Sequence, residues 1–153
     1  MATHSATIEW RRNTVPFVDQ RYSREHEWHF DGGAVVPASS SPHVVPVPLS
    51  NPANVDPEEA YVAALSSCHM LWFLDLAARA GYVVDEYIDH AQGHMGRRED
   101  GTEWVESVVL SPEVRFGGVS APKDEAVRAL HHRAHQACFI ANSVRTEVSV
   151  KPR

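Results

Sequence analysis

Cysteine is scarce in this chain of 153 residues, which contains only Cys68 and Cys138. Long hydrophobic runs are also missing: no stretch approaches 18 uninterrupted apolar residues, so we expect no transmembrane helix. The first seven residues contain no basic segment followed by an apolar one, so we expect no secretory signal. The expected compartment is therefore the cytoplasm, where thiols are kept reduced and a stable structural disulfide is disfavoured.

Clusters of positive charge are absent as well. The formal net charge is −6, which argues against nucleic acid and against anionic membranes as partners. The chain has no glycine-rich phosphate loop and no Ser-His-Asp set with a nucleophile elbow. Its apolar fraction of 43% and charged fraction of 22% are ordinary for a soluble globular protein. The length predicts one domain, residues 1–153.

The first third of the sequence predicts short strands followed by a long loop. Residues 6–12 alternate roughly, residues 25–30 are aromatic-rich, and Asp31-Gly32-Gly33 is a turn signal before a returning strand at residues 34–38. Six of the ten prolines lie in residues 37–57, which predicts a loop with stiff, extended pieces.

A helix start follows this loop. Asp56 is a good N-cap, Pro57 suits the first helical position, and two glutamates complement the positive end of the helix dipole. The helix is predicted to run to about Arg79 and to end at Gly81. Residues 61–78 are apolar nearly all round, which is typical of a central helix covered on several sides. In so short a chain, a second subunit is expected to supply part of that cover.

The remaining sequence predicts two long strands, a second helix and a last strand. The strands are expected at residues 83–95 and 103–116, around a turn at residues 100–101. The second helix is expected from Lys123 to about Cys138, and residues 144–150 alternate as a strand. This order predicts an α+β fold with a mostly antiparallel sheet.

The two cysteines fall in the two predicted helices among small and apolar neighbours, and two interpretations stay open. They are either core residues, since free cysteine is usually buried and inert, or a redox pair in which one thiolate attacks a peroxide and the other resolves the sulfenic acid. A disulfide between Cys68 and Cys138 requires that their Cα atoms lie within about 7 Å, and the separation of the two residues in the sequence does not show whether they do. His69 points about 100° away from Cys68, so it is a poor activating base. Glu58 precedes Cys68 by about 15 Å along one helix, which is too far for contact, so the residues alone indicate only a carboxylate at the helix N-terminus.

The cysteine segments resemble those of a known family. Residues 56–59 (DPEE) and 63–70 (AALSSCHM), with residues 138–144 (CFIANSV), are similar to the OsmC/Ohr family of organic hydroperoxide reductases, and the order of elements agrees over nearly the whole chain. The resemblance implies an intertwined homodimer with no bound cofactor. Each subunit would have a curved sheet around the cysteine-bearing helices, with two active sites at the subunit interface.

The resemblance also implies roles for individual residues. Cys68 would be the peroxidatic cysteine, and Cys138 would resolve it as an intramolecular disulfide that an external dithiol reduces. Glu58 matches the glutamate that pairs with the family's catalytic arginine. For that arginine the sequence offers Arg24 and Arg21, and we favour Arg24, at the mouth of the second strand.

Several further side chains are candidates on weaker grounds. Arg11 and Arg12 lie on the first strand and are less suited to serve Cys68. An apolar pocket for alkyl or lipid hydroperoxides, or else ordinary core, is expected from five residues, which are Trp28, Phe30, Leu71, Trp72 and Phe139.

The chain has ten histidines, and these offer a competing interpretation. His131, His135 and Cys138 fall within about 60° of one helical face and could bind zinc, although a cluster on one helix is a weak signal. His132 is expected on a hydrated face. His26 and His29 lie on opposite faces of a strand and form no joint site. A third class is a non-catalytic small-ligand or metal-binding stress protein of the same fold.

Overall fold

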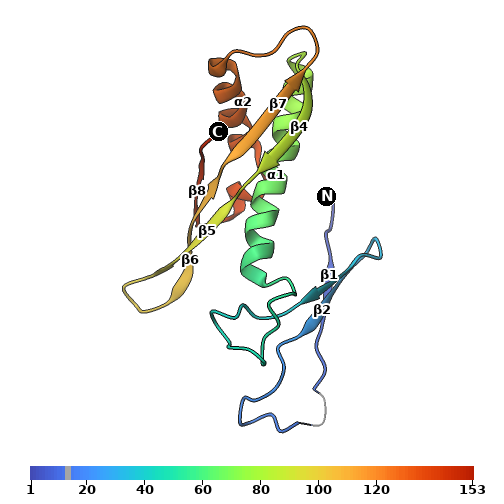
Figure 1. The fold of residues 1–153 in the computed structure, drawn as a ribbon, viewed down its shortest axis with the longest axis vertical. Helices are drawn as coiled ribbons and strands as arrows, with labels where there is room; N and C mark the ends of the chain where they lie inside the picture. The colour runs from blue at the N-terminus through green and yellow to red at the C-terminus, as the bar shows by residue number, and fades with distance from the viewer. Residues whose placement is uncertain (13–14) are drawn as a thin grey trace. The chain divides into compact units, whose positions relative to one another are not determined.

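The computed structural model describes residues 1–12 and 15–153, and Figure 1 shows their helices and strands. The chain forms two compact units, residues 1–60 and residues 61–153. The first unit contains three strands, and the second contains five strands and the α2 helix, with α1 beginning in the first unit. The predicted α+β class is confirmed.

The strands of the first unit form one antiparallel sheet in the order β1-β2-β3. They are β1 (Ala6–Glu9), β2 (His26–Phe30) and β3 (Val35–Ala38). The pairing places Trp28 opposite both Ile8 and Val36. Gly33 has φ of +87° in the turn between β2 and β3, a conformation that favours glycine. The first strand ends at Glu9, three residues earlier than predicted.

The proline-rich loop after β3 is irregular, as predicted, but hydrogen bonds fix its ends. The buried Ser39 accepts a hydrogen bond from the Asn51 amide at its Oγ (2.9 Å), and its own amide donates to the Val55 carbonyl (3.0 Å). The Arg24 amide donates to the Leu49 carbonyl at 2.8 Å. These bonds hold the loop against the segment that carries Arg24.

Helix α1 (Pro57–Arg79) has the predicted bounds. Its start is a reciprocal capping arrangement: the Glu59 amide donates to Asp56 Oδ1 (2.8 Å), and the Asp56 amide donates to Glu59 Oε2 (3.1 Å). Gly81, with φ of +81°, follows the helix end. Among the described residues α1 alone is long and apolar enough to cross a membrane, by length and composition, but its buried side chains here belong to the protein core.

The hairpin that follows α1 differs from the prediction of two long strands. Each of these is divided in two, so that β4 pairs with β7 and β5 pairs with β6 in a separate sheet. Strand β8 joins β6 in parallel. The strands are β4 (Val83–Asp89), β5 (Gln92–Arg97), β6 (Glu103–Leu110), β7 (Pro112–Gly117) and β8 (Glu147–Val150).

Asp89 explains where the hairpin divides. Its carboxylate accepts hydrogen bonds from the Ser111 amide (2.6 Å) and from Ser66 Oγ of α1 (2.5 Å). Both strands are interrupted at this point, and Pro112, which has no amide hydrogen, begins β7. A tertiary contact with the helix therefore sets the break, and strand periodicity does not show it.

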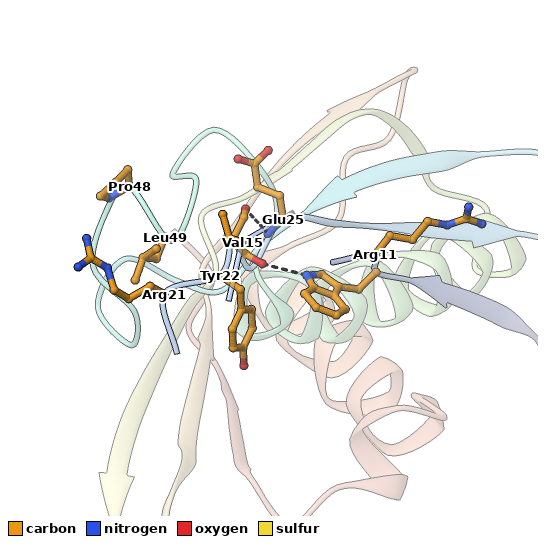
Figure 2. Close-up of a pocket in the computed structure, with 9 residues that line it drawn as sticks. Arg11, Val15, Arg21, Tyr22, Glu25, Pro48 and Leu49 are labelled. Atoms are coloured by element: carbon orange, nitrogen blue, oxygen red, sulfur yellow. Dashed lines mark hydrogen bonds between the residues drawn. The ribbon is translucent and has the colours of Figure 1, made fainter. Parts of the chain in front are cut away.

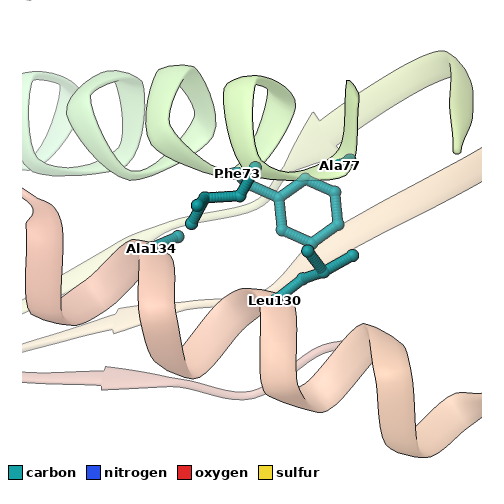
Figure 3. Close-up of a cluster of buried hydrophobic side chains, with 5 residues drawn as sticks. Phe73, Ala77, Leu130 and Ala134 are labelled. Atoms are coloured by element: carbon teal, nitrogen blue, oxygen red, sulfur yellow. The ribbon is translucent and has the colours of Figure 1, made fainter. Parts of the chain in front are cut away.

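Helix α2 (Asp124–Ala137) packs on α1 through small and large apolar side chains. Figure 3 shows Phe73 of α1 directed toward Leu130, with Ala77 and Ala134 beside them. Burying a phenylalanine or leucine here contributes roughly 1.5–3 kcal/mol each. Cys138 is the C-cap of α2, with φ of −64° and ψ of 112°, so the expectation that it lies within the helix is wrong by one residue.

Candidate functional site

The two cysteines are brought together by α1 and the end of α2. Cys68 lies in the middle of α1 and is partly exposed, whereas Cys138 is 1% exposed. Their side chains are near enough for Cys68 to influence the titration of Cys138, and both are free thiols. Neighbouring thiols of this kind can form a disulfide if Cys68 is first oxidised.

Cys138 is held in its protonated form. The pKa of the Cys138 thiol is raised to about 11, chiefly by burial and also by the neighbouring Cys68 side chain, while the amide of Ala141 (3.4 Å from Sγ) acts in the opposite direction. Of the two cysteines, Cys68 is the more exposed, so its sulfur is the one better placed to meet a peroxide from solvent.

The segment after Cys138 is folded back onto the helix end. The short helix η1 (Ala141–Ser143) follows, and the Asn142 side chain donates to the carbonyls of Cys138 (3.0 Å) and Gln136 (2.8 Å). Phe139 is 68% exposed and meets Trp72 edge-on, with 5.4 Å between ring centroids. Two of the five predicted pocket residues thus lie together beside the buried thiol.

Next to each cysteine-bearing segment lies a buried histidine. His69 and His131 are 1% and 3% exposed, and His69 Nε2 is 3.1 Å from His131 Nδ1. The His131 ring also stacks on Phe73 at 4.2 Å. Burial, with the charge of a neighbouring histidine as a smaller cause, lowers the pKa of each imidazole to about 4.

This pairing does not favour the zinc interpretation. His131 directs one ring nitrogen at His69, not at a shared ligand with Cys138. Over residues 1–12 and 15–153, no three His, Cys, Asp or Glu side chains are placed to hold a metal ion. The histidine pair itself was missed from the sequence, because a contact between residues 62 positions apart leaves no local pattern.

Arg24 and Glu58 line one pocket of about 440 Å³ in the first unit. The Arg24 guanidinium lies over the Tyr22 ring, 3.8 Å from its centroid, and donates to the carbonyls of Gln20 (2.7 Å) and Tyr22. These contacts orient the guanidinium, and within the described part of the chain it forms no ion pair with a carboxylate. The remaining lining is mainly apolar, from Ile8, Trp10, Phe17, Val44 and Pro57, with His26, Ser39 and Ser40.

Arg21 belongs to a different pocket. It lines a space of about 410 Å³ with Arg11, Glu25 and Leu49, and Figure 2 shows the side chains of Arg11 and Arg21 extending in different directions. Trp10 and Tyr22 line both pockets, with 5.4 Å between their ring centroids. Of the two candidate arginines, Arg24 is the one that shares a pocket with Glu58.

The apolar pocket is built from residues that the sequence did not single out. The predicted residue Phe30 is 40% exposed and lines neither pocket. Trp10 and Phe17 supply the aromatic lining that was predicted for Phe30, and their rings pack with Tyr22 into one aromatic cluster. The aromatic residues between positions 10 and 22 are the sequence feature that could have indicated this pocket.

Comparison with known proteins now defines the class. The profile of the OsmC-like protein family matches residues 50–153, so the chain belongs to the OsmC-like family. The fold is the OsmC fold, as the resemblance in the sequence implied. No protein with a curated description matches the chain.

Several solved structures are similar to this chain. An OsmC-like protein of unknown function from Vibrio cholerae is 54% identical, with each chain covered over 100% and a TM-score of 0.98. An organic hydroperoxide resistance protein from Elizabethkingia anophelis is 19% identical, with 100% and 98% of the two chains covered and a TM-score of 0.71. One from Bacillus subtilis is 16% identical, with 99% and 98% covered and a TM-score of 0.69. The last two show the shared fold.

Proposed function

We propose that this protein is a thiol-dependent peroxidase that reduces organic hydroperoxides to alcohols. The observation that carries the proposal is that the partly exposed Cys68 and the buried, protonated Cys138 have neighbouring side chains. Some members of the family with this fold are named organic hydroperoxide resistance proteins, which supports the reaction class.

The reaction proceeds in three balanced steps. The Cys68 thiolate attacks the distal peroxide oxygen, the O–O bond breaks, and the alkoxide leaves and takes up a proton to become the alcohol. Cys138 then attacks the sulfur of the Cys68 sulfenic acid, and the hydroxyl leaves as water with the Cys138 proton. An external dithiol reduces the disulfide by thiol–disulfide exchange and is itself oxidised to a disulfide. No bound cofactor takes part.

Arg24 and Glu58 supply charge in this proposal. Arginine stays protonated, so its guanidinium stabilises the thiolate and the negative charge that develops as the O–O bond breaks. Glu58 positions the guanidinium through a paired contact in the working enzyme. The apolar lining of their shared pocket favours a hydroperoxide with an alkyl or aryl group over hydrogen peroxide.

We further propose that the working form is a homodimer in a reducing compartment such as the cytoplasm. Homodimers are typical of this fold. Four exposed residues of α1 are uncharged and recur at spacings of three, four and seven residues, namely Ala64, Ser67, Leu71 and Ala78, and the carboxylate of Asp75 beside them is paired with Arg79. A solvated helix face is normally charged or polar, so this stripe fits contact with a second copy.

The deciding experiment is intact mass under denaturing conditions, before and after one equivalent of cumene hydroperoxide, with free thiols alkylated. We expect a loss of about 2 Da and disappearance of both alkylatable thiols, because the disulfide removes two hydrogens. Cys68→Ser should abolish turnover, and Ser67→Ala, an exposed neighbour on the same helix, should not. Two thiols still alkylated after peroxide treatment would make them core residues of a non-catalytic binder.

Two further variants separate the assigned roles. Cys138→Ser should complete one turnover and then accumulate overoxidised Cys68, so normal cycling of that variant would contradict the resolving role. Arg24→Met should lower the rate of the peroxide step by about a hundredfold, since a charge that stabilises the transition state is lost. Arg21→Met is the matched control and should stay near the wild-type rate. A reversed result would assign the catalytic arginine to Arg21.

A further inference from the structure

A third pocket, independent of the peroxide chemistry, lies between α2 and the C-terminal strand. It has a volume of about 220 Å³. One side is formed by α2, at spacings that place residues 128, 131 and 135 on one helical face, and the other by apolar side chains of β8 and the segment after it. The lining residues are Arg128, His131, His132, His135, Val148, Val150 and Pro152.

Two buried imidazole nitrogens on this side have no hydrogen-bond partner. They are His131 Nε2 and His135 Nδ1. His131 is 3% exposed and lines the pocket, and its Nδ1 is taken by His69, so Nε2 is the ring nitrogen left without a partner. Leaving a buried polar atom unpaired is unfavourable, and a ligand with a suitable polar group would offset that cost.

The charge of the lining indicates the kind of ligand. Arg128 contributes a guanidinium that, within the described residues, has no carboxylate partner. No Asp or Glu lines the pocket. In the tautomer in which His69 donates to His131 Nδ1, the hydrogen of His131 is on Nε2, and that N–H can donate to an anion held by the Arg128 guanidinium. These groups suit an anion, and no metal-binding set is present among the described residues.

The side of the pocket formed by β8 and the segment after it indicates what the uncharged part of the ligand is. Val148, Val150 and Pro152 present only apolar groups, which suit a short hydrocarbon chain. We propose that this pocket binds a small monocarboxylate with a short alkyl chain, its carboxylate held by Arg128 and His131 Nε2–H and its chain against Val148 and Val150. No role assigned to Cys68 or Cys138 is needed for this site.

Butyrate is the probe, followed on the full-length protein by the side-chain nitrogen resonances of its histidines. We expect saturable shifts of His131 Nε2, with little change at the exposed His132. Butyramide has the same shape without the charge and should bind about tenfold more weakly, since hydrogen bonds to charged groups are stronger than neutral ones. Equal binding of butyramide would overturn the anion assignment.

Arg128→Ala tests the site without disturbing the buried ring. It should weaken butyrate binding about tenfold, whereas Arg133→Ala, an exposed arginine on the same helix, should leave it unchanged. Three results would overturn the proposal: no saturable shift with butyrate, equal binding by the Arg128→Ala variant, or stoichiometric Zn²⁺ binding at His131 and His135 that butyrate does not affect.

Discussion

At the scale of single residues, the two thiols differ in burial, although their surroundings in the sequence are similar. Cys138 is buried and Cys68 is partly exposed, and the pKa of Cys138 is raised to about 11, chiefly by burial and also by the neighbouring Cys68 side chain. A raised pKa suppresses the thiolate, so Cys138 is poorly suited to attack peroxide. The proposed division of labour therefore follows from geometry that lies outside either cysteine segment.

The raised pKa gives a prediction for thiol reactivity. With timed iodoacetamide alkylation and peptide mass spectrometry, Cys138 should stay nearly unmodified at pH 7.5, because only roughly one thiol in 10³ is ionised that far below a pKa of 11. Cys68→Ala removes a neighbouring side chain that raises the pKa of Cys138, so it should shift the alkylation profile of Cys138 to lower pH. The same measurement in guanidinium should give an ordinary thiol profile, and an ordinary profile in the folded protein would contradict the prediction.

The buried pair of His69 and His131 makes stability depend on pH. The pKa of each is about 4 in the folded chain and near 6.5 when unfolded, so the unfolded state binds more protons between these values. Their contribution is fully present above pH 6.5 and is lost as the pH falls toward 4. We expect the free energy of unfolding to drop by on the order of 3 kcal/mol over that range, measured by urea titration.

Two variants identify the source of this loss. A His69→Leu/His131→Phe double variant removes both titrating groups, so its stability should change much less between pH 6.5 and 4. His132→Gln alters an exposed histidine of the same helix and should retain the wild-type dependence. If the double variant kept the full dependence, the histidine pair would not be its cause.

At the scale of elements, the sequence predicts what is decided locally. The bounds of α1 follow from Asp56, Pro57 and Gly81, and the capping hydrogen bonds form as expected. The division of the long hairpin was missed because Asp89 is held by Ser66, a residue of another element. The same limit applied to the pocket of Arg24, whose aromatic lining comes from separate segments.

Helix α1 and strand β5 approach each other closely at Gly93, and this contact predicts how a substitution there affects stability. A Cβ added at Gly93 of β5 would lie 2.6 Å from Val62 Cγ2, and β-branched valine has little freedom to move. Gly93→Ala should therefore lower the free energy of unfolding by about 1–3 kcal/mol. Gly32→Ala, at a turn with no atom within 4 Å of the added Cβ, is the control and should be nearly neutral.

A compensating change makes this prediction specific. Adding Val62→Ala to Gly93→Ala opens the space that the new methyl group needs, so the double variant should recover part of the lost stability. Denaturant titration of the two single variants and the double variant forms a complete cycle. Additive losses would show that Gly93 is required by the strand backbone and not by contact with Val62.

At the scale of the whole molecule, α1 has more apolar surface than one chain covers. Leu65, Phe73 and Leu76 are buried, whereas Leu71 is 61% exposed in the middle of the helix. The sequence predicts a helix covered on several sides, and within a single chain that expectation fails along the stripe around Leu71. Contact with a second copy, as is typical of the fold, would complete the cover.

The last prediction concerns this assembly. Size-exclusion chromatography with light scattering should give twice the chain mass of 17.0 kDa. Leu71→Glu places a charge in the stripe and should produce monomers with lower thermal stability, because a buried unpaired charge disfavours association. Val119→Glu alters a fully exposed apolar residue outside α1 and should leave the dimer intact. A wild-type mass of one chain would contradict the homodimer, and a dimeric Leu71→Glu variant would place its interface away from this face of α1.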